Sequence, residues 1–214
     1  YSMRVTALSV ACLIALSCVT TSGEDAVART LRRVAMCTVP IEVHTPSGVG
    51  TGSGSVIGCR SARDGFRVLV LTAKHVAVEG EKPNCSLQIR GYPARVVSHH
   101  TECDASILEI SSTDAMPRLR IGRRSVDVGE AIYNFGFSGG CREMWISRGV
   151  ASAANRGGHA APGDSGGPVV TERGELIGVV EAVDVLGFGQ LIMHHCTFVP
   201  VARIESWLDR HTAH

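Results

Sequence analysis

Residues able to do covalent chemistry lie late in the chain, in the hexapeptide Gly163-Asp-Ser-Gly-Gly-Pro168. It opens into the apolar pair Val169-Val170, which indicates a tight loop leading into a strand. A serine held on such a loop can act as a nucleophile. The backbone amides of Gly163 and Ser165 could then form an oxyanion hole around a tetrahedral intermediate. Glycine-rich runs also make ordinary turns, so this interpretation requires a base and a carboxylate elsewhere in the chain.

The candidate base is His75. A free serine hydroxyl is hardly ionised at neutral pH and needs a neighbouring base to become nucleophilic. Among nine histidines, His75 stands out because it follows the apolar run 67–73, so a buried strand ends close to an imidazole. Most of the others fall in turns, in a late strand or in the C-terminal tail. A histidine at a strand end can also be purely structural, so the assignment depends on the serine motif.

The candidate carboxylate is Asp104, which directly precedes the apolar strand 105–110. An aspartate at the start of such a strand is costly to bury unless it is paired, and a histidine could pair with it. In a triad the carboxylate holds the tautomer of the imidazole and stabilises the imidazolium. The chain order His75, Asp104, Ser165 differs from the orders found in α/β-hydrolases and subtilisins.

Short strands must position these residues. Turn residues separate about six candidate strands up to Ile110, and 24 glycines in the chain suit many turns. The polar segment 111–117 predicts a link to a second group of strands. These are expected at 118–121, 130–137, 143–153, 168–171, 175–185 and 189–199. Val201, Ile204 and Leu208 share one face of a predicted helix at 200–210. We therefore expect an all-β protein of two six-stranded antiparallel β-barrels with a short C-terminal helix.

Composition limits the function classes. With 44% hydrophobic residues the chain can bury a substantial core, and a formal net charge of +1 gives no support for a nucleic-acid partner. A charged start and a 15-residue apolar run, 5–19, predict that residues 1–22 form a signal peptide or an N-terminal anchor. Residues 23–36 would be an N-terminal arm or pro-segment. We therefore expect an exported protein, secreted or periplasmic.

Six cysteines follow this leader: Cys37, Cys59, Cys85, Cys103, Cys141 and Cys196. An even number in an exported chain suggests disulfides, with 15 possible pairings. No two form a C-x-x-C pair, so a zinc site is not favoured. The pairing that we favour joins Cys59 to Cys85, on either side of His75, and would stabilise the fold by about 3 kcal/mol.

Three signatures together resemble those of trypsin-like serine proteases: Thr72-Ala-Lys-His75-Val, Asp104-Ala-Ser-Ile-Leu and Gly163-Asp-Ser-Gly-Gly-Pro168. The spacing is closest to bacterial trypsin-like peptidases of the Deg type, although no sequence remains for their PDZ domain. The resemblance covers roughly 41–208 and implies the chymotrypsin fold, a peptidase domain over 37–214 and a polypeptide substrate. It implies no metal or organic cofactor.

The resemblance leaves activation and specificity open. Asp164 matches the residue that, in digestive members, pairs with an N-terminus freed by cleavage. Arg32-Arg33 could be such a cleavage site, but removal of an arm without an activation switch is the simpler interpretation. The resemblance also assigns six residues to the substrate pocket: His159, Ala160, Val180, Glu181, Ala182 and Val183. Val183 would narrow the pocket and favour small aliphatic residues, whereas His159 could favour an acidic one, a preference that the nearby Glu181 would oppose.

The sequence therefore predicts an exported serine endopeptidase with the triad His75, Asp104 and Ser165. Two alternatives stay open at this point. One is a binding or regulatory protein on the same fold whose chemistry is vestigial. The other is an esterase that uses the same triad.

Overall fold

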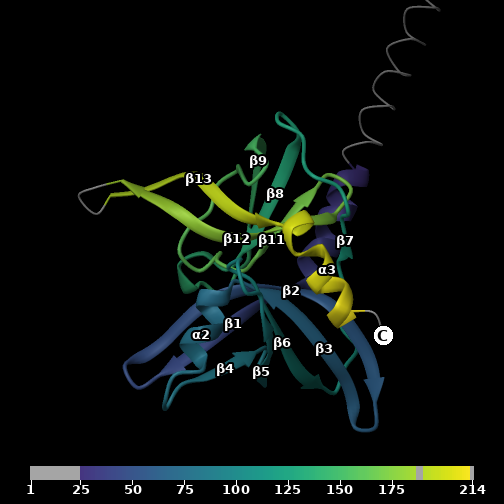
Figure 1. Ribbon diagram of the computed structural model, residues 1–214, viewed down its shortest axis with the longest axis vertical. Helices are drawn as coiled ribbons and strands as arrows, with labels where there is room; N and C mark the ends of the chain where they lie inside the picture. Colours follow the sequence, from purple (N-terminus) through teal and green to yellow (C-terminus); the bar gives the residue numbers. More distant parts are fainter. Residues whose placement is uncertain (1–24, 187–189, 213–214) are drawn as a thin grey trace, which may run out of the picture.

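The computed structural model describes residues 25–186 and 190–212, and the predicted leader, residues 1–22, lies outside them. The chain folds into two β-barrels with a helix at each end of the described part (Figure 1). The first barrel is closed, with strand order β1-β2-β3-β6-β5-β4. Its strands are β1 Thr38–Thr45, β2 Gly48–Ala62, β3 Gly65–Thr72, β4 Ser86–Ile89, β5 Tyr92–His99 and β6 Ser106–Ser112.

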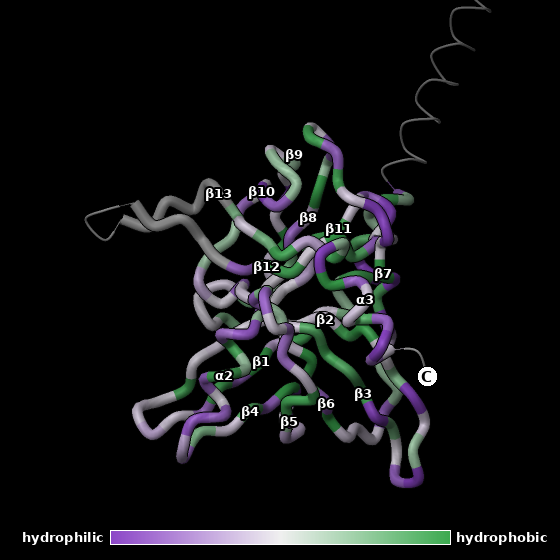
Figure 2. The backbone as a smooth tube through the Cα atoms, in the orientation of Figure 1, coloured by the Kyte–Doolittle hydropathy of each residue, from purple (hydrophilic) through white to green (hydrophobic). Residues whose placement is uncertain are grey.

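Alternation of apolar residues fills the first barrel. In β1, Val39, Ile41 and Val43 point inward and are buried, while Glu42 between them is exposed. Strand β3 is buried on both faces from Val70 to Thr72, whereas Arg67 near its start is exposed, so the predicted buried strand is confirmed for its second half. Val70 belongs to the core of the barrel, whereas Leu71 packs into a separate cluster shared with the second barrel. Strand β3 is accordingly green along much of its length in Figure 2.

The second barrel is a ring of six antiparallel strands in the order β11-β8-β9-β10-β13-β12, closed by the pairing of β11 with β12. The two-residue strand β7, Arg120–Ile121, adds to β12 in parallel. A 3₁₀ turn, η1 Ser138–Gly140, follows β8. The strands of the ring are β8 Ala131–Gly136, β9 Trp145–Ala153, β10 Arg156–Gly157, β11 Pro168–Thr171, β12 Glu175–Leu186 and β13 Gln190–Pro200. The predicted pair of six-stranded barrels is confirmed.

The two barrels are joined by the interbarrel segment, residues 113–119. It begins two residues later than the predicted link, because Ser111 and Ser112 still pair with Arg67 and Phe66 of β3. At its end Leu119 is buried, and its amide donates to the carbonyl of Val56 in β2, 2.9 Å away. The segment is therefore anchored to the first barrel before the second begins.

Both helices cover the seam between the barrels. The helix at 25–37 buries Val34 and packs Val27 and Leu31 on the shared cluster, at the spacing of one helix face. Helix α3, Val201–Thr212, buries Val201, Ile204, Trp207 and Leu208. The indole nitrogen of Trp207 donates to Ser98 Oγ in β5, at 3.0 Å, so α3 ties the end of the chain to the first barrel. None of the helices in the described residues is long and apolar enough to cross a membrane.

The predicted bridge between Cys59 and Cys85 is not formed. All six cysteines of the described part are free thiols. Cys59 lies on β2, where its sulfur accepts from the amide of Met116, while Cys85 precedes β4 and contacts the carbonyl of Pro83. Strand β1 separates β2 from β4 in the barrel. Closeness to His75 along the chain therefore does not bring these two cysteines together.

Candidate active site

His75 and Asp104 are brought together at the top of the first barrel. Strand β3 ends at Thr72, and the short helix α2, Lys74–Gly80, places His75 in its first turn. The imidazole Nδ1 lies 2.7 Å from Asp104 Oδ2, and the backbone amide of His75 donates to Oδ1 at 2.8 Å. The carboxylate thus holds both the ring and the backbone of the histidine. This arrangement leaves Nε2 as the atom that can face a substrate.

The electrostatics of the pair follow from this contact. The hydrogen bond from Asp104 raises the pKa of His75, despite the opposing effect of burial. Burial pushes the pKa of Asp104 upward, but the hydrogen bonds from the His75 ring and amide outweigh it and lower that pKa overall. Glu181 also contributes to the raised pKa of His75 through its negative charge. The pair is therefore poised to stabilise an imidazolium.

A second histidine organises the turn that carries Asp104. His100 Nδ1 accepts hydrogen bonds from the amides of Glu102 and Cys103, at 3.2 and 3.0 Å. The backbone carbonyl of His100 accepts from Lys74 Nζ, at 2.9 Å, which links the turn to the residue before His75. The His100 ring packs edge-on against Trp207 of α3. These contacts fix the position of Asp104 from both sides. The sequence places His100 in a polar turn and does not predict this role, because a histidine that accepts from nearby backbone amides carries no distinctive pattern.

We expect His100→Phe to lower kcat for a peptide substrate by roughly tenfold, because loss of the acceptor lets the Asp104 turn shift. His100→Asn should retain most of the activity, since its amide oxygen can replace Nδ1 as the acceptor. The comparison is made on kcat and KM separately, with thermal unfolding measured for each variant. Destabilisation alone would lower the active fraction of both variants, but it would not give His100→Asn a higher kcat than His100→Phe. Equal kcat values in the two variants would contradict the positioning role.

Ser165 reaches the same place from the second barrel. It lines a cavity of about 210 Å³ together with His75, Val76 and Glu79 of α2 and residues of β1 and β2. Its backbone carbonyl accepts from the amide of Ser53 in β2, at 2.8 Å. The structure therefore brings the three predicted triad residues to one location, two from the first barrel and one from the second.

Two backbone amides at Ser165 and in the loop before it have no hydrogen-bond acceptor in the described chain. The N–H groups of Gly163 and Ser165 make no hydrogen bond with any part of the chain that the structure describes. Gly163 adopts φ +98°, and a Cβ at this position would collide with the carbonyl of Phe137. Its own carbonyl accepts from Ser53 Oγ, at 2.7 Å, and that oxygen in turn accepts from the amide of Phe137, at 3.0 Å. Ser53, which the sequence does not single out among many small residues, thus holds the Gly163–Asp164 peptide, which lies between the two amides that would form the oxyanion hole.

Gly166 lets the nucleophile loop pack directly on the first barrel. It has φ +87°, and a Cβ would collide with Thr72 Oγ1 and the carbonyl of Ser53. Thr72 Oγ1 donates to that same carbonyl at 2.8 Å, immediately before the segment that carries His75. The glycine therefore sets a close contact between the two halves of the site.

Asp164 is buried and satisfied within its own barrel. Its carboxylate accepts from Ser138 Oγ at 2.6 Å and from the amide of Ala161 at 2.8 Å. Burial nevertheless raises its pKa. Arg32 and Arg33 lie within the helix at 25–37. The conformation of Asp164 is thus held without an N-terminus as its partner, and cleavage of the arm stays a prediction.

The residues predicted to form the substrate pocket are placed differently from one another. His159 and Ala160 line a small cavity of about 100 Å³ with Asn134, Trp145 and Asp164. Val180 instead belongs to the buried core of the second barrel. Glu181 is half-buried; Ala182 and Val183 pair with Thr197 and Cys196 of β13, and their side chains lie outside the described part. The preference of the pocket stays a prediction.

No group of three or more histidine, cysteine or acidic residues in the described ranges is arranged to hold a metal ion. The candidate machinery consists of side chains and backbone amides.

Two six-stranded antiparallel barrels with a histidine–aspartate pair and a serine at their seam define the chymotrypsin-fold class. The family model for the trypsin-like peptidase domain matches residues 52–179, more than half of the chain. The protein therefore belongs to the trypsin-like peptidase family, as its three signatures indicated. No curated protein matches the chain at a significant level.

Proposed function

We propose that the protein is a serine endopeptidase that cleaves polypeptides through the triad His75, Asp104 and Ser165. The observation that carries the proposal is the 2.7 Å contact between His75 and Asp104 beside the cavity that Ser165 lines. Family membership supports the peptidase class and a polypeptide substrate. The export predicted from residues 1–22 remains part of the proposal.

The reaction follows from these positions. Ser165 Oγ attacks the peptide carbonyl while His75 Nε2 takes the hydroxyl proton, and the carbonyl oxygen becomes an oxyanion held by the amides of Gly163 and Ser165. The tetrahedral intermediate collapses as the imidazolium passes that proton to the leaving amine, which leaves an acyl-enzyme. Water, deprotonated by His75, then releases the new carboxylate and restores Ser165.

The test is covalent labelling by a fluorophosphonate probe, which reacts with an activated serine. We expect the unmodified chain to be labelled, with strongly reduced labelling in His75→Ala and none at position 165 in Ser165→Ala. Labelling that persists in Ser165→Ala would overturn the nucleophile assignment. Absence of labelling in a folded, unmodified chain would instead favour a vestigial site on this fold.

A further inference from the structure

Two cavities with arginine-rich walls lie outside the catalytic site and share no residue with the cavity of His75 and Ser165. One, of about 390 Å³, lies between the helix at 25–37, the interbarrel segment and the turn from β11 to β12. The other, of about 250 Å³, lies between β2, β3, β5 and the end of α3. Arg118 lines both cavities, and we call the pair the arginine groove.

Four of the eight arginines of this groove have neither an anionic partner nor a side-chain hydrogen bond within the described chain. Arg33, Arg118, Arg173 and Arg210 form no ion pair with any residue that the structure describes. They come from four separate parts of the chain: the helix at 25–37, the interbarrel segment, the turn from β11 to β12, and α3. Their convergence is therefore a product of the fold and not of one basic stretch of sequence.

The remaining arginines of the groove are already neutralised or bound. Arg60 and Arg95 share the buried carboxylate of Glu109, the single acidic side chain in the walls of either cavity. Arg120 pairs with Glu175 at 2.7 Å, and Arg67 donates to Ser111 Oγ. The groove therefore keeps a clear excess of positive charge, although the net charge of the chain is only +1.

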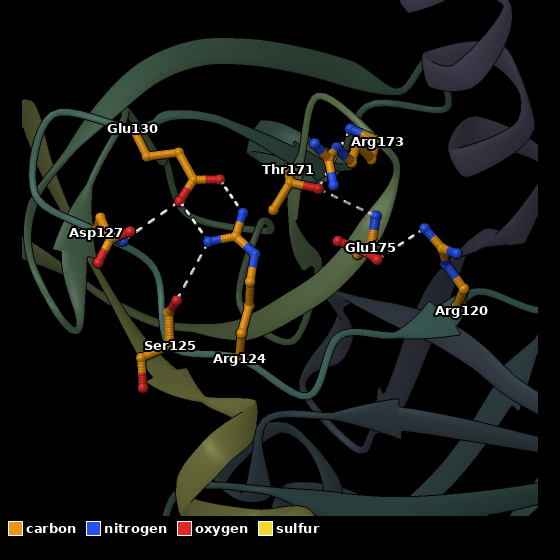
Figure 3. Close-up of polar contacts among 8 residues, drawn as sticks. All are labelled: Arg120, Arg124, Ser125, Asp127, Glu130, Thr171, Arg173 and Glu175. Carbon is orange, nitrogen blue, oxygen red and sulfur yellow. Dashed lines mark hydrogen bonds and ion pairs between the residues drawn. The ribbon is translucent and has the colours of Figure 1, made fainter.

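The two arginines that follow β7 are paired with acidic side chains, although most arginines of the described chain form no ion pair. Arg124 is fully engaged by Glu130 and the carbonyl of Ser125, and Arg123 binds both Glu205 and Asp209. Figure 3 shows this contrast beside the groove: Arg120 and Arg124 each contact a glutamate, whereas Arg173 is bonded only through its backbone amide to Thr171.

We propose that the arginine groove binds a linear polyphosphate. The guanidinium group presents a planar fork of donors that matches phosphate oxygens, and the groove contains no lysine. Its walls contain no tryptophan, tyrosine or phenylalanine, so the stacking surfaces that single-stranded nucleic acids use are missing there. The two cavities share Arg118 in their walls and offer guanidinium groups at more than one place, which suits a chain of phosphate groups better than a single ion.

The proposal is tested by calorimetric titration of inorganic tripolyphosphate into the full chain carrying Ser165→Ala, which removes self-cleavage and makes the result independent of the proposed protease function. We expect binding that weakens as salt is raised. Arg118→Gln should weaken tripolyphosphate binding about tenfold or more, since the charge-assisted hydrogen bonds that Arg118 would donate to phosphate oxygens in both cavities are lost. Arg33→Gln with Arg173→Gln should have a similar effect. The matched control is Arg142→Gln, which removes an exposed arginine outside the groove and should change the affinity less than about twofold.

Each outcome decides the proposal. Absence of binding at low ionic strength, or an equal loss in Arg142→Gln and Arg118→Gln, would overturn it, because the second result indicates attraction by net charge alone. Binding of sulfated oligosaccharide or of single-stranded DNA that is tighter than that of tripolyphosphate would also overturn the choice of ligand. Thermal unfolding of each variant in the absence of ligand separates a lost site from a lost fold.

Discussion

Replacing Ser165 by alanine is expected to reduce kcat for peptide hydrolysis by about 10⁶-fold, because the acyl-enzyme can no longer form. The measurement is the rate of peptide cleavage by the purified variant, with circular dichroism and thermal unfolding to show an intact fold. The side chain of Ser165 makes no hydrogen bond within the described chain, so its removal should change stability little.

The matched control is Ser61→Ala, an exposed serine at the end of β2 whose hydroxyl also has no partner in the described part of the chain. It should retain full activity. Residual cleavage in Ser165→Ala within about tenfold of the unmodified chain would show that another group is the nucleophile. If a serine-protease inhibitor slows cleavage by the same factor in the unmodified chain and in Ser165→Ala, the activity comes from a contaminating protease.

Asp104→Asn is expected to lower kcat by about 10⁴-fold, because the amide would favour the wrong tautomer of His75 and cannot stabilise its imidazolium. The pH dependence supplies a second, independent readout. His75 must be neutral to act as a base, so kcat/KM rises with pH through its pKa, which Asp104 raises. Without the carboxylate that pKa falls, and the acidic limb of the profile should move to lower pH.

The control for this variant is Asp64→Asn, a change of the same type at an exposed turn between β2 and β3. It should alter neither kcat nor the pH profile. An Asp104→Asn profile whose acidic limb stays in place, or moves to higher pH, would contradict the assigned contact.

The same pair contributes to stability in a defined pH window. The raised pKa of His75 favours the folded state at pH values below its unfolded pKa, and this contribution is lost as pH rises through the folded pKa. The lowered pKa of Asp104 favours the folded state above its unfolded pKa and is lost as pH falls through the folded pKa. Both contributions are therefore present together between roughly pH 4 and pH 6.5.

Local patterns predicted most of the fold. Strand β11 matches its predicted bounds, and most others differ by one or two residues, because alternation of buried and exposed side chains is visible in the sequence. Strand β10 was missed, since two residues are too few to carry a period. The helix at 25–37 was predicted only as an N-terminal arm or pro-segment, residues 23–36. Its packing against the shared core depends on Leu119 and Leu176, which are distant in sequence.

The candidate site could likewise be predicted from the sequence only in part. His75, Asp104 and Ser165 were found from short motifs, since each stands next to an apolar strand that positions it. Ser53 was missed because its hydrogen bond to the carbonyl of Gly163 joins residues that only the folded chain brings near. His100 was missed because a histidine that accepts from nearby backbone amides carries no distinctive sequence pattern. The prediction of a disulfide between Cys59 and Cys85 was wrong. Proximity along the chain does not show whether another strand of the barrel separates two residues.

The division of the triad between two barrels affects when the protein can become active. His75 and Asp104 belong to the first barrel, which the chain completes by Ser112, whereas Ser165 sits on the second. That second ring is incomplete until β13 pairs with β10 and β12, and α3 then fastens Trp207 to Ser98 of the first barrel. During synthesis the nucleophile therefore cannot be aligned with its base until β13 and α3 have followed it. The proposed triad is therefore completed by contacts that form after Ser165 has been made, not by the local segment that carries the serine.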